Sequence, residues 1–206
     1  MKRRIQRLKH LGIRLKRIRY RKGYGVHSPF AFRLITEIIF ESYPYYGYAE
    51  IQKTPALLGR ENINLSTKVL KLIFRLVNWR QPSSILEIGA TSNLKIAVTQ
   101  AKKNAQLVYS ETIISALNTK HLPSDLVFIN HNKTSETLKE SKEKIFQLIH
   151  SGSLLVISGI GYSNEMKELW KSIQQDERAG ITFDLYEVGL VFFDLEKNKQ
   201  DYTVNF

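Results

Sequence analysis

The sequence predicts an α/β fold with a mostly parallel sheet and a helical extension at its amino terminus. Apolar runs at residues 85–88, 125–130 and 154–158 are continuous, as in strands that are buried on both faces. Helical patterns alternate with these runs, which is typical of a parallel sheet. Before residue 83 the apolar periodicity is helical throughout. We therefore place the start of an α/β core, residues 83–206, at this change of pattern.

The first 22 residues form a basic tail. They hold eleven of the 31 Lys and Arg residues and none of the 19 acids, which leaves 20 bases against 19 acids for the rest of the chain. Apolar residues at spacings of three and four predict a helix over residues 2–20 with a cationic face. Such a helix suits an anionic membrane surface or nucleic acid as a partner, and it equally suits packing on the domain with its basic face in solvent.

Residues 23–82 form the predicted helical extension. Ser28 and Pro29 together are a helix start, a cap followed by a first-turn proline, and the pattern continues to about Phe40. Four tyrosines then fall within residues 43–48, a density typical of a loop that covers a ligand or packs an appendage onto the core. Packing is the favoured interpretation. A further helix is predicted over residues 66–78.

The core is predicted to open on a strand that runs into a helix at Ile85–Asn93. In an open α/β sheet the carboxyl end of the first strand is where a nucleotide-like ligand sits. The later patterns predict, in order, a helix at 94–101, strands at 106–109 and 125–130, a helix at 134–150, a strand at 154–158, a helix at 166–173, and antiparallel strands at 181–186, 189–195 and 202–206.

Composition excludes several classes of site. The chain has no cysteine, which removes disulfides, thiolate catalysis and cysteine zinc sites. Charges interrupt the apolar residues of the amino terminus every two or three positions, so no export signal is expected. No apolar run approaches the length of a membrane span. We expect a soluble, cytoplasmic protein, with peripheral membrane association left open by the basic tail.

Several motifs together resemble class I S-adenosylmethionine-dependent methyltransferases, most closely bacterial proteins related to small-molecule O-methyltransferases. Their order and spacing over nearly the whole chain carry the resemblance. They are Tyr24–Phe32 (YGVHSPFAF), the tyrosine loop, Leu86–Gly89 (LEIG), Asp125–Ile129 (DLVFI), Glu165–Trp170 (EMKELW) and Asp184–Phe193 (DLYEVGLVFF). The resemblance implies a Rossmann-like sheet and S-adenosylmethionine as the cofactor.

The resemblance also implies a set of cofactor-binding residues. Glu87 and Gly89 match positions that shape the pocket for the methionine part, and Glu111 matches the acid that hydrogen-bonds the ribose hydroxyls. A carboxylate suits a diol or an ammonium, and glycine lets backbone approach a ligand. Ala90, Asn93 and Asn130 complete the candidate set.

The chain departs from the family pattern at several of these positions. Asn93 stands where the family has a second glycine, although asparagine tolerates the left-handed conformation that such a turn uses. Lys95 replaces a small residue in the first turn of the next helix, where a cation opposes the helix dipole. Asn130 stands where the family has an acid. Paired acids and a histidine are likewise replaced, at Ser158, Gly159 and Gly161. His131 is near, but a lone loop histidine is more often a bystander than a base.

The interval between Glu111 and Asp125 is short. It contains thirteen residues, and one parallel crossover needs about a dozen. It therefore has room for one helix and no further strand, whereas a full methyltransferase has an additional strand and helix here. We expect a sheet narrowed by that missing strand and open on the adenine side.

Three interpretations of function follow. The leading one is a degenerate methyltransferase-like protein with weak or lost cofactor binding, no metal and no assigned catalytic residue. The second is an active small-molecule O- or N-methyltransferase whose substrate pocket uses Tyr24, His27, Tyr45 and Tyr46. The third is a non-catalytic protein that docks on anionic membrane or nucleic acid through residues 1–22.

Overall fold

The structure is a computed structural model that describes residues 12, 17, 20, 23–53, 65–89, 93–118, 122–130, 138–194 and 198–206. The helix predicted over residues 2–20 lies outside these residues, apart from single positions. The first part of the helix predicted at 134–150 lies outside them too, and α7 begins at Leu138. Among the described residues, no helix is both long and apolar enough to cross a bilayer.

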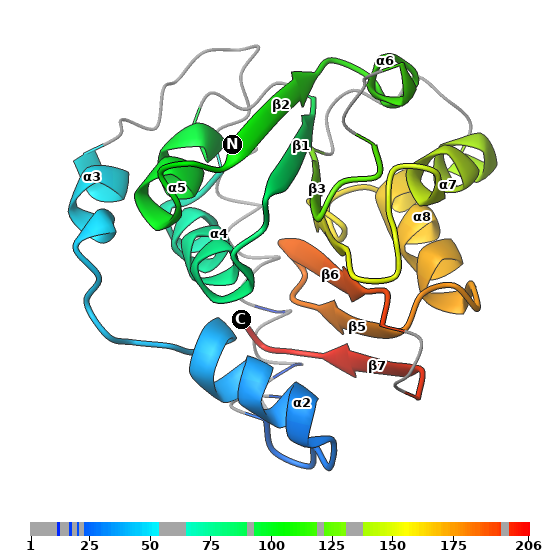
Figure 1. The fold of residues 1–206 in the computed structure, drawn as a ribbon. Helices are drawn as coiled ribbons and strands as arrows, with labels where there is room; N and C mark the ends of the chain where they lie inside the picture. Colours follow the sequence, from blue (N-terminus) through cyan, green and yellow to red (C-terminus); the bar gives the residue numbers. More distant parts are fainter. Residues whose placement is uncertain are drawn as a thin grey trace, which may run out of the picture.

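A seven-stranded sheet organises the core, in the order β2-β1-β3-β4-β6-β5-β7 (Figure 1). Strands β1 to β4 are mutually parallel, and β6 runs antiparallel to both of its neighbours, β4 and β5. The strands are β1 Ser84–Ile88, β2 Gln106–Ser110, β3 Leu126–Ile129, β4 Leu154–Ser158, β5 Ile181–Asp184, β6 Val188–Phe192 and β7 Gln200–Thr203.

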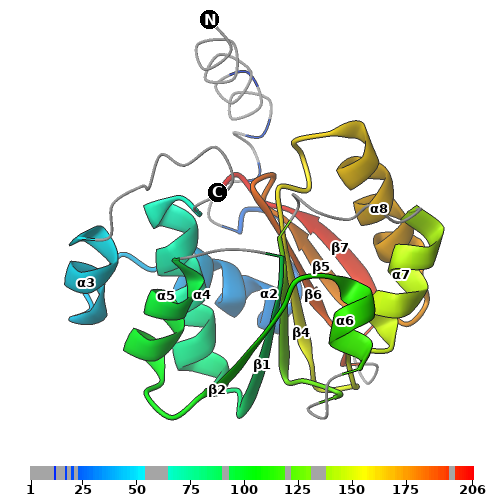
Figure 2. The same cartoon turned by 90° about the horizontal axis from the view of Figure 1, so that it is seen from above.

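Helices cover both faces of the sheet, so that the molecule has three layers (Figure 2). One face is covered by α2 Pro29–Arg33, α4 Thr67–Arg80 and α5 Leu94–Ala101, with α3 Gly47–Lys53 packed against α4 and α5 from outside, and the other by α6 Ile113–Leu117, α7 Leu138–Phe146 and α8 Asn164–Gln175. Alternate residues of each strand point to opposite faces. Ile85 and Phe128 accordingly pack with the α2–α5 layer, whereas Leu86 and Val127 pack with the α6–α8 layer.

This architecture confirms the predicted fold class, a Rossmann-like, mostly parallel sheet with an antiparallel carboxyl-terminal part. In the described part of the interval after Glu111 there is one short helix, α6, and no strand, so β2 is a sheet edge as predicted. The sheet still has seven strands because β7 adds to the opposite edge. The prediction of antiparallel pairing was wrong for this last strand, since β7 pairs in parallel with β5.

Within the amino-terminal extension, the buried side chain of Arg75 joins α4 to the helical segments that precede it. The Ser28 hydroxyl accepts a hydrogen bond from the Ala31 N–H and begins α2, as the sequence predicted, and a π-helix, η2 (Leu34–Ile39), continues it. Arg75, on α4, donates hydrogen bonds to the carbonyls of Ile38 and Ile39 and to the hydroxyl of Tyr48 on α3. One side chain thus connects three helical segments.

Candidate functional site

The carboxyl ends of the parallel strands meet at one edge of the sheet. Beyond the strand ends, the Gly89 N–H donates to the Ser110 carbonyl at 3.0 Å, and the Asn130 N–H donates to the Ile88 carbonyl at 2.9 Å. The ladders joining β1 to β2 and β1 to β3 therefore continue into the loops. This brings Glu87, Gly89 and Asn130 together, and Glu111 follows β2 at the adjacent, exposed position.

Glu87 is the buried acid of this edge, with only 3% of its surface exposed. It lies in register with Tyr109 on β2 and Phe128 on β3, and therefore points toward the helix layer that contains α5. Partial burial raises the pKa of the Tyr109 hydroxyl, and the negative charges of Glu111 and Glu87 raise it further. The local field at this corner is therefore negative, which suits a cationic or hydroxyl-bearing ligand.

Gly89 ends β1 in a conformation that side chains rarely adopt, with φ of +80°. A Cβ added at this position would lie 3.3 Å from Cβ of Asn130. The backbone here is thus in close contact with the start of the loop after β3, and a glycine is required for conformation as well as for space.

Asn130 and Ser158 form a neutral pair where β3 and β4 end. The Ser158 hydroxyl donates to Oδ1 of Asn130 at 3.0 Å, and both residues are buried. The positions at which the resemblance led us to expect acids are therefore occupied by an amide and a hydroxyl that contact each other. Neither group changes its protonation state near neutral pH.

Asn93 fastens the segment before α4 to the start of α5. Its amide nitrogen donates to the Leu65 carbonyl at 3.0 Å, and its Oδ1 accepts from the Leu65 N–H at 3.2 Å. Its φ of −107° is outside the left-handed region, so the conformation expected from the family's glycine is not adopted. Ala90 lies outside the described residues, and Lys95 is exposed.

The loop after β4 packs against the turn between β5 and β6. The Gly159 N–H donates to the Glu187 carbonyl at 2.6 Å and the Gly161 N–H to the Tyr186 carbonyl at 3.0 Å, and a Cβ on Gly161 would overlap the Tyr186 ring. Burial, followed by the charge of Glu187, raises the pKa of Tyr162 well above its ordinary value. Tyr162 thus stays a neutral phenol at physiological pH.

The four substrate-pocket candidates lie away from this edge. Tyr24, 85% exposed, lines a cavity beside β7, and β7 is five strand spacings, roughly 24 Å, from β1. His27 is exposed. Tyr45 packs on Phe74 at 5.2 Å between ring centroids, and Tyr46 is fully exposed.

The tyrosine loop contacts the end of α5 that lies away from the start of that helix. A Cβ on Gly47 would lie 2.9 Å from Cβ of Gln100, which is six residues, about 9 Å along the axis, beyond Leu94. The described residues of the loop therefore pack the extension onto the helix layer. His131 lies outside the described residues.

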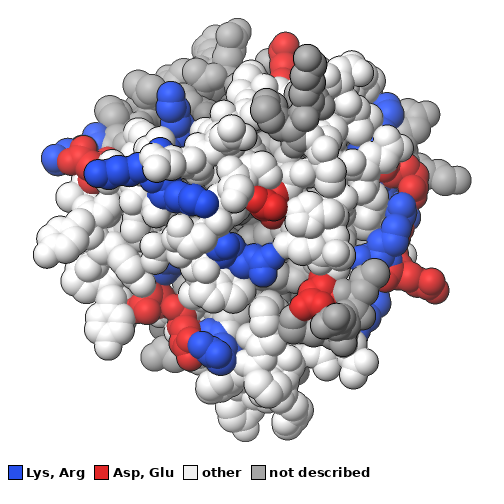
Figure 3. Space-filling view, viewed as in Figure 1, with Lys and Arg blue, Asp and Glu red and all other residues white. Residues whose placement is uncertain are grey.

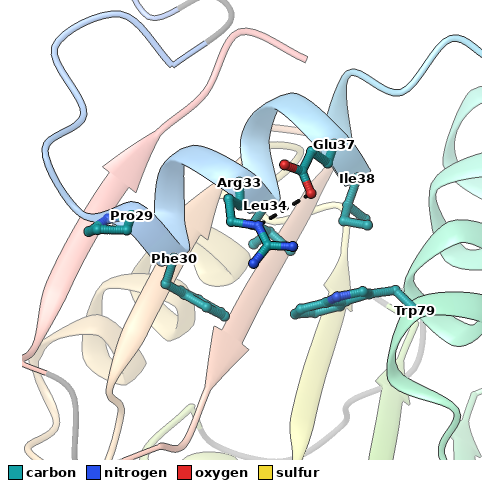
Figure 4. A pocket seen from close by; sticks show the side chains of 7 residues that line it. All are labelled: Pro29, Phe30, Arg33, Leu34, Glu37, Ile38 and Trp79. Atoms are coloured by element: carbon teal, nitrogen blue, oxygen red, sulfur yellow. Dashed lines mark hydrogen bonds and ion pairs between the residues drawn. The ribbon is translucent and has the colours of Figure 1, made fainter.

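A separate cavity of about 300 Å³ lies near the amino ends of the parallel strands (Figure 4). The rings of Phe30 and Trp79, 6.2 Å apart, form part of its wall, and the Arg33–Glu37 ion pair at 3.4 Å lies at its rim. Ligands of open α/β sheets bind at the opposite, carboxyl ends of the strands. This cavity is therefore distinct from the candidate site.

Two residues at the site could not be found by sequence reasoning. Ser110 accepts the Gly89 N–H through its backbone carbonyl, which no side-chain motif signals. Leu65 is held by Asn93 through backbone groups alone. Within the described ranges, no three His, Cys, Asp or Glu residues gather in a way that could hold a metal ion.

No protein-family model and no curated protein sequence matches the chain. Solved structures do match its fold. The methyltransferase PaMTH1 from Podospora anserina, solved with bound SAH, is 10% identical, with a TM-score of 0.51 over 82% of this chain and 97% of that one. A protein from Corynebacterium glutamicum is 12% identical, with a TM-score of 0.52 over 81% of this chain and 97% of that one. The chain thus has the fold that the sequence resemblance implied.

Proposed function

We propose that this chain, built on a methyltransferase fold, is a degenerate methyltransferase-like protein whose carboxyl-edge crevice binds S-adenosylmethionine weakly and has weak or lost transfer activity. The hydrogen bond from Ser158 to Asn130 is the observation that carries the proposal. It joins two neutral side chains where β3 and β4 end, next to the Gly89 turn, at the place where a proton acceptor would be needed.

The residues at the end of β1 fit one part of the cofactor. Glu87 offers a buried carboxylate, a suitable acceptor for an ammonium or hydroxyl group, and the left-handed Gly89 lets the backbone approach a ligand. Glu111, which follows β2, is exposed and so is accessible to a ribose diol. Structural relatives of this fold include one solved with SAH, which supports the same choice of ligand.

Other features oppose tight binding. The amide of Asn93 hydrogen-bonds both the N–H and the carbonyl of Leu65, so it is oriented by the protein's own backbone. Beyond β2 the described residues contain no further strand, so no strand of theirs walls the adenine side of the crevice. A bound S-adenosylmethionine supplies an electrophilic methyl group, but the protein must hold donor and acceptor in line for transfer.

The enzyme interpretation needs a base, and the described residues where β3 and β4 end, Asn130 and Ser158, do not supply one. A general base must lie within hydrogen-bonding reach of the acceptor and titrate near the working pH. Asn130 and Ser158 do not titrate there. Tyr24 and His27, the groups that we assigned to an active enzyme, belong to the segment beside β7 and the start of α2.

Calorimetric titration of the full chain with S-adenosylmethionine tests the proposal. We expect binding weaker than micromolar for the wild type. Glu87→Ala is the test variant, and Glu177→Ala, an exposed acid on the loop after α8, is the matched control. Micromolar binding that Glu87→Ala abolishes and Glu177→Ala retains would contradict the proposal.

A transfer assay separates weak binding from activity. The chain is incubated with donor carrying a labelled methyl group and with a metabolite extract, and we expect no labelled product above a heat-denatured control. Labelled product that depends on Glu87 would establish the enzyme interpretation instead. A peptide or nucleic-acid acceptor in the extract would be identified by the fraction that retains the label.

A further inference from the structure

Strand β7 leaves backbone hydrogen-bonding groups at a free edge of the sheet. The N–H groups of Gln200 and Val204 point inward to the carbonyls of Gly180 and Asp184. Because backbone groups alternate along a parallel ladder, those of Asp201 and Thr203 point away from β5. Across the described chain, no hydrogen bond uses these outward groups, and β7 ends the strand order.

The protein already uses one outward group next to this edge, in a contact with a helical turn at Tyr20. The N–H of Asn205, the next outward residue after Thr203, donates to the Tyr20 carbonyl at 3.2 Å. Gly23, whose φ is +77°, and the three residues after it line a cavity together with Asp201–Thr203. An outward group at this end of the sheet can thus bond to another backbone, and within the described ranges those of Asp201 and Thr203 have no such bond.

A cavity of about 330 Å³ adjoins the open part of the edge. It lies on the η2 side of the sheet, since Ile35 and Val26 line it together with the outward residues of β7. Tyr202, also in the lining, stacks on Phe183 with centroids 5.2 Å apart and rings 20° from parallel. On a strand added to β7, the residue opposite Tyr202 would point to the same face of the sheet as Tyr202. Its side chain would lie over the cavity, beside Tyr202 and the exposed Tyr24.

On the opposite face of the edge lies Asp201, an acid for which the described residues provide no cation. Asp201 accepts a hydrogen bond from the Thr182 hydroxyl at 2.6 Å and has no ion pair among the described residues. Asp176 and Asp184 are both paired with Lys or Arg. On the face shown in Figure 3, basic and acidic side chains are interspersed. A Lys or Arg on an added strand opposite Asp201 would form an ion pair with its carboxylate.

We propose that the β7 edge binds an extended peptide by strand addition, with an apolar or aromatic side chain in the adjoining cavity and a Lys or Arg opposite Asp201. The alternation follows from the pleat, because neighbouring residues of the added strand face opposite sides. Main-chain hydrogen bonds to Asp201 and Thr203 supply affinity, and the two side chains supply specificity.

A second copy of the chain fits this edge less well. Antiparallel self-pairing centred on Tyr202 sets Asp201 of one copy against Thr203 of the other. The two carboxylates then gain no cation, and each copy brings an exposed Tyr24 to the same edge. A peptide that alternates basic and aromatic residues satisfies both faces.

Fluorescence anisotropy with a labelled peptide of alternating lysine and phenylalanine tests the proposal on the full chain. Thr203→Pro removes an outward N–H and no bond to β5, and Thr203→Val, which keeps the N–H, is its matched control. We expect Thr203→Pro to weaken binding about tenfold, the effect of losing one or two hydrogen bonds, and Thr203→Val to leave it within about twofold.

Two further arms do not depend on the folding of the proline variant. Asp201→Asn should weaken binding a few-fold and reduce its salt dependence, because an exposed ion pair is screened. A peptide that is N-methylated on the residues facing the edge should lose binding, whereas one methylated on the alternate residues should retain it.

The proposal is overturned if the wild type shows no saturable binding up to about millimolar protein, the weakest affinity that a specific site of this kind would have. It also fails if Thr203→Pro and the N-methylated peptide bind as well as their controls. A concentration-dependent dimer, seen by sedimentation and lost in Thr203→Pro, would assign the edge to a second copy and exclude the peptide.

Discussion

Replacing Arg75 by methionine should loosen η2 and α3 from α4 at a measurable cost in stability. Arg75 is only 7% exposed and donates to two carbonyls at the end of η2 and to the Tyr48 hydroxyl. No ion pair to this guanidinium is found among the described residues. Its partners are therefore neutral acceptors, and methionine can fill the volume without supplying a donor.

The magnitude follows from the acceptors left behind. A buried acceptor that loses its donor costs about 1–3 kcal/mol, and hydrogen bonds to a charged donor are at the upper end of the usual range. The Tyr48 hydroxyl can reorient, and release of a buried charge offsets part of the loss. We expect Arg75→Met to lower the free energy of unfolding by about 2–4 kcal/mol.

Urea unfolding followed by circular dichroism measures this change. Lys167→Met, on the exposed face of α8, is the matched control and should change stability by less than about 0.5 kcal/mol. Combining Arg75→Met with Tyr48→Phe should show a coupling energy of about 1 kcal/mol, since the two side chains share a hydrogen bond. A loss below about 1 kcal/mol for Arg75→Met, with no coupling, would refute the reasoning.

Three other predictions concern the site, the acids and the tail. Gly89→Ala should destabilise the fold by about 1–2 kcal/mol in urea unfolding, because its φ is positive and the added Cβ would meet Asn130; an unchanged midpoint would contradict this. Arg178 and Lys142 hold the pKa of Asp176 well below its ordinary value. The contribution of Asp176 to stability is therefore present above about pH 4 and is lost as the pH falls further. Asp176→Asn should make the melting temperature depend less steeply on pH below about pH 4, and an unaltered slope would contradict this prediction. Arg17→Gln, which removes a two-pronged contact to Asp184, should speed tryptic cleavage within residues 1–22 and shift the melting temperature by only a few degrees; unchanged cleavage would show that the contact does not anchor the tail.

The layered fold could be predicted because its signals are local. The buried runs of β1, β3 and β4 are continuous and apolar, and Ser28 and Ser66 begin their helices by capping, a feature that is readable from sequence. The short interval after Glu111 identified β2 as an edge strand, since chain length limits what a crossover can contain.

The pairing of the last strand was not predictable in the same way. Residues 200–203 have no apolar alternation that distinguishes a parallel from an antiparallel neighbour. Their direction follows from the route of the chain around β6, which pairs antiparallel to both β4 and β5. Register between distant strands is a tertiary property, and only the assembled sheet determines it.

At the candidate site, the positions of Glu87 and Gly89 at the end of a buried strand were predictable, but the hydrogen-bond partners of the neighbouring residues were not. The Gly89 turn and the buried Glu87 follow from a strand that ends in an acid and a glycine. The hydrogen bond from Ser158 to Asn130 joins residues 28 positions apart, and so does the one from Asn93 to Leu65. No periodicity or motif encodes such contacts, so the sequence could indicate altered residues without showing that they bond to the protein itself.

The hydrogen bond between Tyr20 and Asn205 has a consequence for how the chain can be rearranged. It places the backbone of Tyr20 next to that of Asn205, with the Tyr20 carbonyl oxygen 3.2 Å from the Asn205 amide nitrogen. Circular permutation is tolerated where such ends are close and the new break falls in an exposed turn. A short linker from Phe206 to the segment before Gly23, with new termini at the exposed Lys103–Asn104 turn, should preserve the sheet order. The linear order of the chain is thus one of several that the same set of contacts can support.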